Sequence, residues 1–280
     1  MVRRRISPQP PSRLAIWARR LAIFALPVAL LAVIFERTGM FEIWPVMATF
    51  GAALALAALA ILLALAALVS IWFSGASGGA QALLAIVLAV ALLGYPGYLA
   101  VKASRLPWIH DITTDPYDPP RFEVVARARG RDANSVVYGG LAVYQQQRAA
   151  YPDVEPLETN ATPQQAYDAA LAVVTRRKWR IVDERPPIPG RRDGRIEAIA
   201  FSPIMGFRDD VVIRVRASGG GARVDARSAS RYGEHDFGDN AARVQALLDD
   251  IDAASSPEQI ERAARRTSRP PAANGQPARR

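Results

Sequence analysis

The residue types best suited to chemistry gather in one polar stretch late in the chain, residues 227–240, which read RSASRYGEHDFGDN. Serine, histidine and aspartate can act together as nucleophile, base and orienting group, so Ser228 or Ser230 with His235 and Asp236 could form a hydrolytic site. Adjacent histidine and aspartate side chains generally diverge, and nothing in the sequence fixes a serine beside them. An envelope hydrolase is therefore an alternative hypothesis, and the sequence assigns no catalytic residue.

The same stretch could bind an anion instead. Alternation along a strand places Arg227 and Arg231 on one side of it, and paired arginines can clamp a carboxylate or a phosphate. The predicted ligand-binding residues are these arginines and the polar neighbours that would hold the loop: Asp209, Asp210, Arg227, Ser230, Arg231 and Asn240. A purely structural interpretation stays open, in which the two aspartates pair with the arginines across a sheet, Gly233 turns the chain and residues 236–240 cap a helix.

The composition gives little support for a metal site or a bound cofactor. The chain has two histidines and no cysteine, which excludes multi-histidine metal sites and most zinc arrangements. A carboxylate-only site for a hard cation stays open, but we expect no metal and no cofactor. Residues 75–79 match the GxSxG pattern formally. A nucleophile elbow needs a strand before the serine and a helix after it, whereas these residues lie between two apolar stretches. The sequence therefore favours a protein that is not an enzyme.

The polar stretch must be positioned by an α+β domain, an antiparallel sheet with flanking helices, over residues 107–255. Thr162 to Gln165 form a capping box with proline at the first helical position, which predicts a helix to about Arg177. A closing helix capped by Asp239 or Asn240 is predicted from apolar residues at helical spacing. Residues 132–151 are ambiguous. The predicted strands are residues 121–128, 179–183, 195–201, 210–217 and 222–230, the last two joined as a hairpin by three glycines.

Three apolar stretches precede this domain, at residues 14–35, 44–73 and 80–101. At about 1.5 Å per residue, the second and third can cross a hydrocarbon core of about 30 Å. The first is weaker, because Pro27 interrupts it and Arg19 and Arg20 must reach back to the interface. A cleaved signal peptide is the alternative for that stretch. The prediction is a three-helix transmembrane anchor over residues 1–106.

The position of the basic residues predicts the orientation of this anchor. Six arginines lie before or at the start of the first apolar stretch, whereas the two loops between the stretches contain only Arg37. The positive-inside rule then keeps the N-terminus in the cytoplasm, and three crossings deliver the later domain to the other side. We expect a multi-pass protein of the bacterial inner membrane with a periplasmic C-terminal domain.

The net charge of +9 does not indicate a nucleic-acid partner, because it lies outside the domain. Residues 1–106 carry +7 and residues 256–280 carry +4, which leaves −2 for the domain between them. A slightly acidic domain is a poor phosphate-binding surface, so nucleic-acid binding is excluded. The basic tail, residues 256–280, is rich in arginine, proline and alanine and is predicted to be disordered.

Several segments of the domain resemble domain of unknown function family 1499, found in bacterial envelope-associated proteins. The resemblance rests on DITTDPYDPPRF at 111–122, YPDVEPL at 151–157, IEA at 196–198, GFRDDVVIRV at 206–215 and VDARSASRYGEHDFGDNAARV at 224–244, and covers about residues 111–254. Because the family has no assigned reaction, the resemblance implies a domain boundary and no catalytic role.

The leading hypothesis is a non-enzymatic membrane protein that displays a ligand-binding or partner-binding domain on the periplasmic side. Its expected partners are the lipid bilayer and either an envelope protein or an anionic ligand. The alternatives are the envelope hydrolase described above and a scaffolding subunit of a membrane complex.

Overall fold

The computed structural model describes residues 10–188 and 193–256. Almost all of the predicted disordered tail therefore lies outside the described residues. The chain divides into two compact units, one formed by the residues up to Arg105 together with Ser202–Phe207, and the other by the remaining residues from Leu106 onward.

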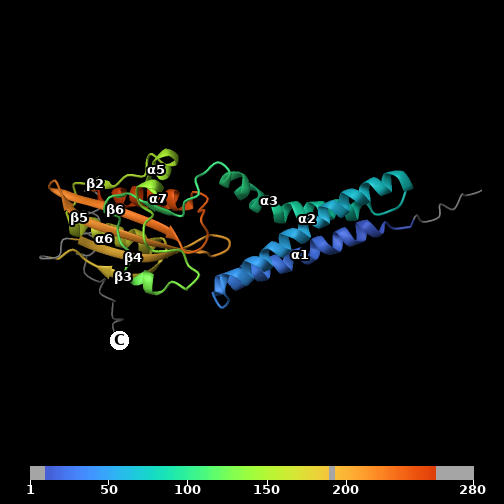
Figure 1. The fold of residues 1–280 in the computed structure, drawn as a ribbon, viewed down its shortest axis with the longest axis horizontal. Helices are drawn as coiled ribbons and strands as arrows, with labels where there is room; N and C mark the ends of the chain where they lie inside the picture. Colours follow the sequence, from blue (N-terminus) through green and yellow to red (C-terminus); the bar gives the residue numbers. More distant parts are fainter. Residues whose placement is uncertain (1–9, 189–192, 257–280) are drawn as a thin grey trace, which may run out of the picture. The chain divides into compact units, whose positions relative to one another are not determined.

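Three long helices make up the first unit (Figure 1): α1 (Arg13–Thr38), α2 (Ile43–Ser74) and α3 (Gly79–Ala103). They confirm the three helices predicted from the apolar stretches. Each is long and apolar enough to cross a membrane, by length and composition. Ser12 N–H donates to the Ser77 carbonyl at 2.8 Å, so α1 begins beside the turn from which α3 begins.

The packing of this bundle is the reverse of that in a soluble protein. Its buried positions are alanines at helical spacing, such as Ala60, Ala64 and Ala67 of α2, while large apolar side chains such as Leu62 and Phe24 are 64% and 58% exposed. Small residues let helix backbones approach closely, and large apolar side chains facing outward suit a hydrocarbon environment. This arrangement supports membrane association.

The second unit is built on a six-stranded antiparallel sheet in the order β1-β6-β5-β4-β3, with β2 also paired to β6. It confirms the predicted α+β architecture and the predicted hairpin, whose strands β5 and β6 are joined through Gly219 and Gly220, both with positive φ. The strands are β1 (Asp111–Thr113), β2 (Leu157–Thr159), β3 (Arg180–Arg185), β4 (Asp193–Phe201), β5 (Arg208–Ser218) and β6 (Gly221–Ser230).

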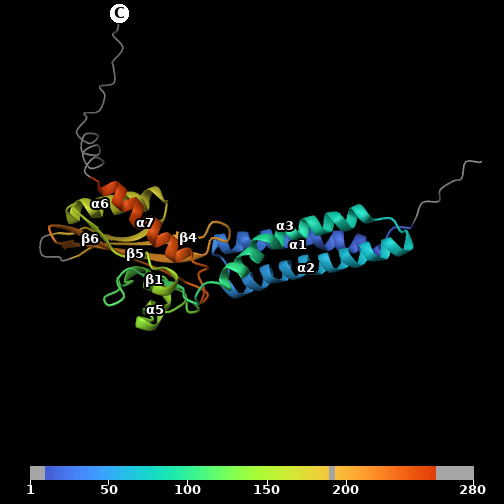
Figure 2. The ribbon, with the colours of Figure 1, turned by 90° about the horizontal axis from the view of Figure 1, so that it is seen from above.

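Helices α6 (Pro163–Arg176) and α7 (Asp239–Ser255) cover one face of the sheet (Figure 2). The capping box predicted for α6 is present, since the Thr162 hydroxyl and the Gln165 side chain each accept from the other's backbone N–H. The main core lies between these helices and the sheet and includes Val173, Leu247 and Ile213, all completely buried. A shorter helix, α5 (Gly140–Ala150), occupies the region that the sequence left ambiguous.

Two local predictions are wrong. Residues 121–128 are not a strand; they contain a single helical turn, α4 (Val124–Arg127). Helix α7 is not capped by Asp239 or Asn240, because its N-cap residue is Gly238, and the carboxylate of Asp236 accepts the N–H groups of Gly238 and Asn240 instead. The short strands β1 and β2 were not predicted.

Candidate functional site

The face of the sheet opposite α6 and α7 carries the charged residues. Successive side chains of a strand point to opposite faces, so Val211, Ile213 and Val215 of β5 pack in the main core, whereas Asp210 and Arg214 point to the other face. That second face is partly covered by the segment that follows β1, which includes α4.

Asp210 is held at the centre of this face by two arginines. Arg231 donates from Nε and Nη2 to Oδ1 at 2.9 and 2.8 Å, and Arg129 donates from Nε to Oδ2 at 2.7 Å. The side chain of Asp210 is completely buried. Both oxygens of this carboxylate are therefore used within the protein.

Arg227 is equally enclosed. Its Nε and Nη2 donate to the two oxygens of Asp111 at 2.9 and 2.6 Å, and its Nη1 donates to the Pro120 carbonyl at 3.1 Å. The guanidinium carbon lies 4.6 Å from the ring centroid of Phe122 and 5.5 Å from that of Tyr138. This cluster ties strand β1 and the segment after it to β6.

The remaining predicted residues form a polar network on the other face, beneath α7. Asn240 accepts from the Ser228 hydroxyl at 2.6 Å and donates to the Ser230 hydroxyl at 2.9 Å. Arg243 donates to the Ser228 hydroxyl at 2.9 Å and to Asp209 at 2.5 Å. The six predicted ligand-binding residues therefore lie on two different faces of the sheet, and their charged groups pair with other groups of the protein. Their contact with a ligand stays a prediction.

The proposed hydrolytic residues are not assembled. His235 accepts from the N–H of Phe237 through Nδ1 at 2.8 Å, and Asp236 accepts from the backbone at the start of α7. Both serines bond instead to Asn240, and no hydrogen bond links them to His235 within residues 10–188 and 193–256. This arrangement supplies no base for a serine nucleophile.

A different constellation surrounds Glu197 on β4. One oxygen accepts from the N–H of Glu123 and the other from those of Val124 and Val125, each at 2.9 Å, so that the carboxylate occupies the start of α4. A carboxylate at a helix N-terminus satisfies donors that have no partner within the helix, which explains why this segment forms a turn of helix rather than a strand. Arg195, two residues earlier on β4, lies against the same carboxylate.

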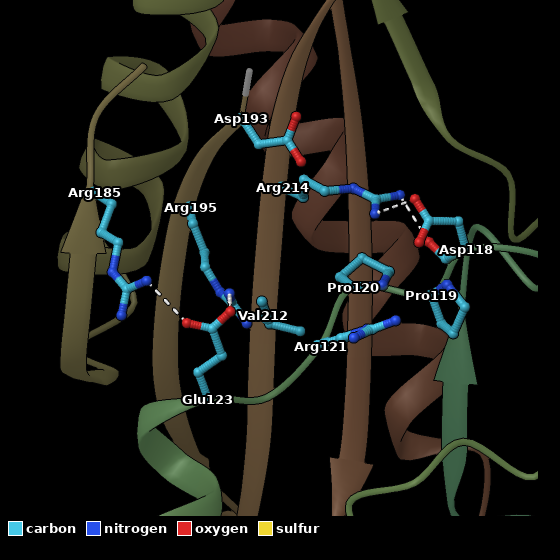
Figure 3. A pocket seen from close by; sticks show the side chains of 10 residues that line it. All are labelled: Asp118, Pro119, Pro120, Arg121, Glu123, Arg185, Asp193, Arg195, Val212 and Arg214. Carbon is cyan, nitrogen blue, oxygen red and sulfur yellow. Dashed lines mark hydrogen bonds and ion pairs between the residues drawn. The ribbon is translucent and has the colours of Figure 1, made fainter. Parts of the chain in front are cut away.

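Beside this constellation the charged face opens into a hollow of about 400 Å³ (Figure 3). It lies between strands β3 to β5 and the segment that precedes α4. Its lining combines four arginines, three carboxylates and three apolar residues: Asp118, Pro119, Pro120, Arg121, Glu123, Arg185, Asp193, Arg195, Val212 and Arg214.

Two of these arginines have unused hydrogen-bonding capacity. Nη1 of Arg195 is paired with Glu123, and Nε lies 3.1 Å from Oε1 of Glu197 without hydrogen-bond geometry. Both Nε and Nη2 are buried and make no hydrogen bond in the described part of the chain. Arg121 is exposed, and neither an ion pair nor a hydrogen bond to its side chain occurs among the described residues. By contrast, Arg214 donates to Asp118 and Asp225 at 2.8 and 3.0 Å. Buried guanidinium donors without acceptors favour the binding of an anion.

The acidic neighbour of Arg195 is electrostatically coupled to it. Burial acts to raise the pKa of the Glu123 carboxyl, but the hydrogen bond and charge of Arg195, and then those of Arg185, outweigh it and lower that pKa below its ordinary value. Glu123 is therefore ionised at neutral pH and occupies one side of the Arg195 guanidinium, while Nε and Nη2 make no hydrogen bond in the described part of the chain.

The sequence did not reveal this hollow. Arg121, Arg195 and Arg214 come from separate segments, and no motif joins them. The one available signal was strand alternation, which puts Arg195 on the same face of β4 as Glu197. Glu197 is a charged residue at a position where a half-buried strand would carry an apolar one.

Residues 111–251 match the family described as "Protein of unknown function (DUF1499)". No match is found among curated proteins or among solved structures.

Proposed function

Because the chain belongs to the DUF1499 family, whose description assigns no activity, we propose a function from the geometry: a membrane protein whose α+β domain binds a small anionic ligand in the Arg195 hollow. The observation that carries this proposal is the pair of buried donors on Arg195, Nε and Nη2, that have no acceptor among the described residues. A guanidinium group that is largely shielded from water gains more from an anion than an exposed one does.

The three helices of the first unit support integral insertion in a membrane. All three pass the length and composition expected of spanning helices, and α1 packs along α2 and α3 over alanine-lined contacts. The hydrogen bonds between Ser12 and Ser77, and between Ser77 and Pro10, fix the starts of α1 and α3 at one end of the bundle. Three crossings of alternating direction then put the residues after α3 opposite that end.

The orientation follows from arginines near the start of α1, including Arg13, Arg19 and Arg20. The positive-inside rule assigns that end to the cytoplasm and the domain to the periplasmic side of an inner membrane. A single cysteine tests this orientation, because the chain has no native thiol. Exposed Ala217 is a better position than Gly219 or Gly220, whose positive φ a cysteine would strain. A membrane-impermeant maleimide should label Ala217→Cys in intact spheroplasts; labelling only after lysis would contradict the orientation.

The ligand site is tested by calorimetry on the full chain in phosphatidylcholine nanodiscs, titrated with a panel of small carboxylate and phosphate anions. Binding should be abolished in Arg195→Gln and weakened in Arg121→Gln. Arg176→Gln is the matched control, because Arg176 is an exposed arginine whose side chain pairs with Asp250 on the helical face. Equal affinity in the wild type and Arg195→Gln would refute the proposed site.

A further inference from the structure

We infer that the anion taken by the Arg195 hollow is a monocarboxylate attached to a short apolar group, in preference to a phosphate or sulfate. This inference rests on the proposed function and names the ligand class of the same site. It is drawn from the shape of the unused donors, from the charge balance of the lining and from the apolar part of the lining.

The shape of the donors matches a carboxylate. Arginines elsewhere in this domain use the edge formed by Nε and Nη2 to hold one: Arg227 binds Asp111 at 2.9 and 2.6 Å, and Arg177 binds one oxygen of Asp250 at 3.1 and 2.7 Å. On Arg195 the same two nitrogens are the buried ones without a hydrogen-bond partner. A planar carboxylate can accept from both nitrogens of such an edge at once.

One protein group already lies near this edge. Nε of Arg195 is 3.1 Å from Oε1 of Glu197, within range of an ion pair but without hydrogen-bond geometry. That oxygen accepts instead from the N–H of Glu123 at 2.9 Å. Glu197 therefore offsets part of the charge of Arg195 without using its donors.

The charge balance of the lining favours a single negative charge. Among the described residues, four arginines and three carboxylates line the hollow, and Glu197 offsets part of the charge of Arg195, so the site carries at most one net positive charge. A carboxylate carries one negative charge, whereas a phosphate monoester carries about 1.5 to 2 near neutral pH. The excess charge of a phosphate would lie close to Glu123 and Asp118, which repel it.

The rest of the lining suits a short apolar group. Val212, Pro119 and Pro120 line the same hollow as Arg195 (Figure 3). A volume of about 400 Å³ is larger than a carboxylate alone would fill. Small-molecule sites commonly combine an apolar lining with a few polar groups that fix orientation.

The test compares ligands that differ either in their charged group or in the length of their apolar chain. Butanoate, butyl phosphate and acetate are titrated into the full chain in phosphatidylcholine nanodiscs, with empty nanodiscs as the reference for partitioning into lipid. Butanoate should bind at least about tenfold more tightly than either of the others, the difference expected for one charge-assisted hydrogen bond or a few buried methylene groups. Hydrogen exchange at α4 checks that Arg195→Gln stays folded, and Arg121→Gln provides a second variant at an unpaired, exposed residue.

The outcomes separate the inference from the proposed function. Tighter binding of butyl phosphate, lost in Arg195→Gln, would overturn the carboxylate class and leave the anion site standing. Equal binding of acetate and butanoate would overturn the apolar part of the inference. If none of the three ligands binds, both the inference and the proposed function fall.

Discussion

Arg231 donates two hydrogen bonds, 2.9 and 2.8 Å long, to Oδ1 of Asp210, and the Asp210 side chain is completely buried. Two residues predicted to contact a ligand are thus joined to each other, in the interior of the domain. Removing one partner of a buried ion pair leaves the other charge without compensation. The pair therefore contributes to the stability of the sheet.

Arg231→Ala should accordingly destabilise the domain by about 3 to 5 kcal/mol, the range measured when one partner of a buried pair is removed. Hydrogen exchange at β5 and β6 of the full chain in nanodiscs measures the opening free energy. Arg176→Ala, which removes an exposed ion pair, should change it by at most about 1 kcal/mol. An Arg231→Ala domain that keeps its stability but loses anion binding would restore the ligand role predicted from the sequence.

Glu197→Ala should release the first turn of α4. Three N–H groups lose their acceptor, and the buried one, on Val125, is left unsatisfied at a cost of about 1 to 3 kcal/mol. The amides of Val124 and Val125 should exchange faster, by a larger factor than the amides of the main core. Glu184→Ala is the matched control, an exposed glutamate on neighbouring β3, and should leave α4 unchanged. Unaltered exchange in Glu197→Ala would show that α4 forms without this carboxylate.

Ser228 and Ser230 should not react with a fluorophosphonate probe. Ser228 is completely buried, and both hydroxyls bond to Asn240, with no histidine positioned as a base in the described residues. The probe is applied to the full chain in nanodiscs beside a serine hydrolase as positive control, and labelled peptides are identified by mass spectrometry. Labelling of either serine would revive the envelope hydrolase.

His110 should make the domain less stable in mild acid. Burial is the largest influence on its pKa and lowers it, helped by Arg129 and opposed by Asp111, Asp236 and Glu234. The unfolded state then binds more protons than the folded state below about pH 6.5, so stability falls as the pH falls through that range. The opening free energy measured by hydrogen exchange between pH 7 and pH 5 should decrease more in the wild type than in His110→Gln. Parallel pH profiles would contradict this assignment.

The elements that could be predicted are those whose signals are local. The capping box at Thr162 and Gln165 satisfies donors within one turn, and the glycines after Ser218 supply the positive φ of a tight hairpin. The three long helices of the first unit follow from the length of the apolar stretches. Each of these signals lies within a few residues of the structure that it determines.

The elements that could not be predicted depend on distant partners. Helix α4 forms although the local pattern predicted a strand. Its first N–H groups donate to Glu197, which lies 74 residues away from Glu123 in the chain, so no local signal could show it. The partner of Arg227 is Asp111, 116 residues earlier. Strand β2 pairs with residues 222–224 of β6, and at the preceding Gly221 a Cβ atom would lie 2.0 Å from the Thr159 carbonyl. This close approach needs a glycine that the sequence analysis assigned only to the turn. The Arg195 hollow is likewise assembled by tertiary structure.

The most direct measurement of the central claim is the dissociation constant for butanoate in the wild type and in Arg195→Lys, both as full chains in nanodiscs. Lysine keeps the positive charge but cannot present two donors in a planar edge. Butanoate should bind at least about tenfold more weakly to Arg195→Lys, the loss of one charge-assisted hydrogen bond. Equal dissociation constants would show that the unpaired edge of Arg195 does not hold the ligand.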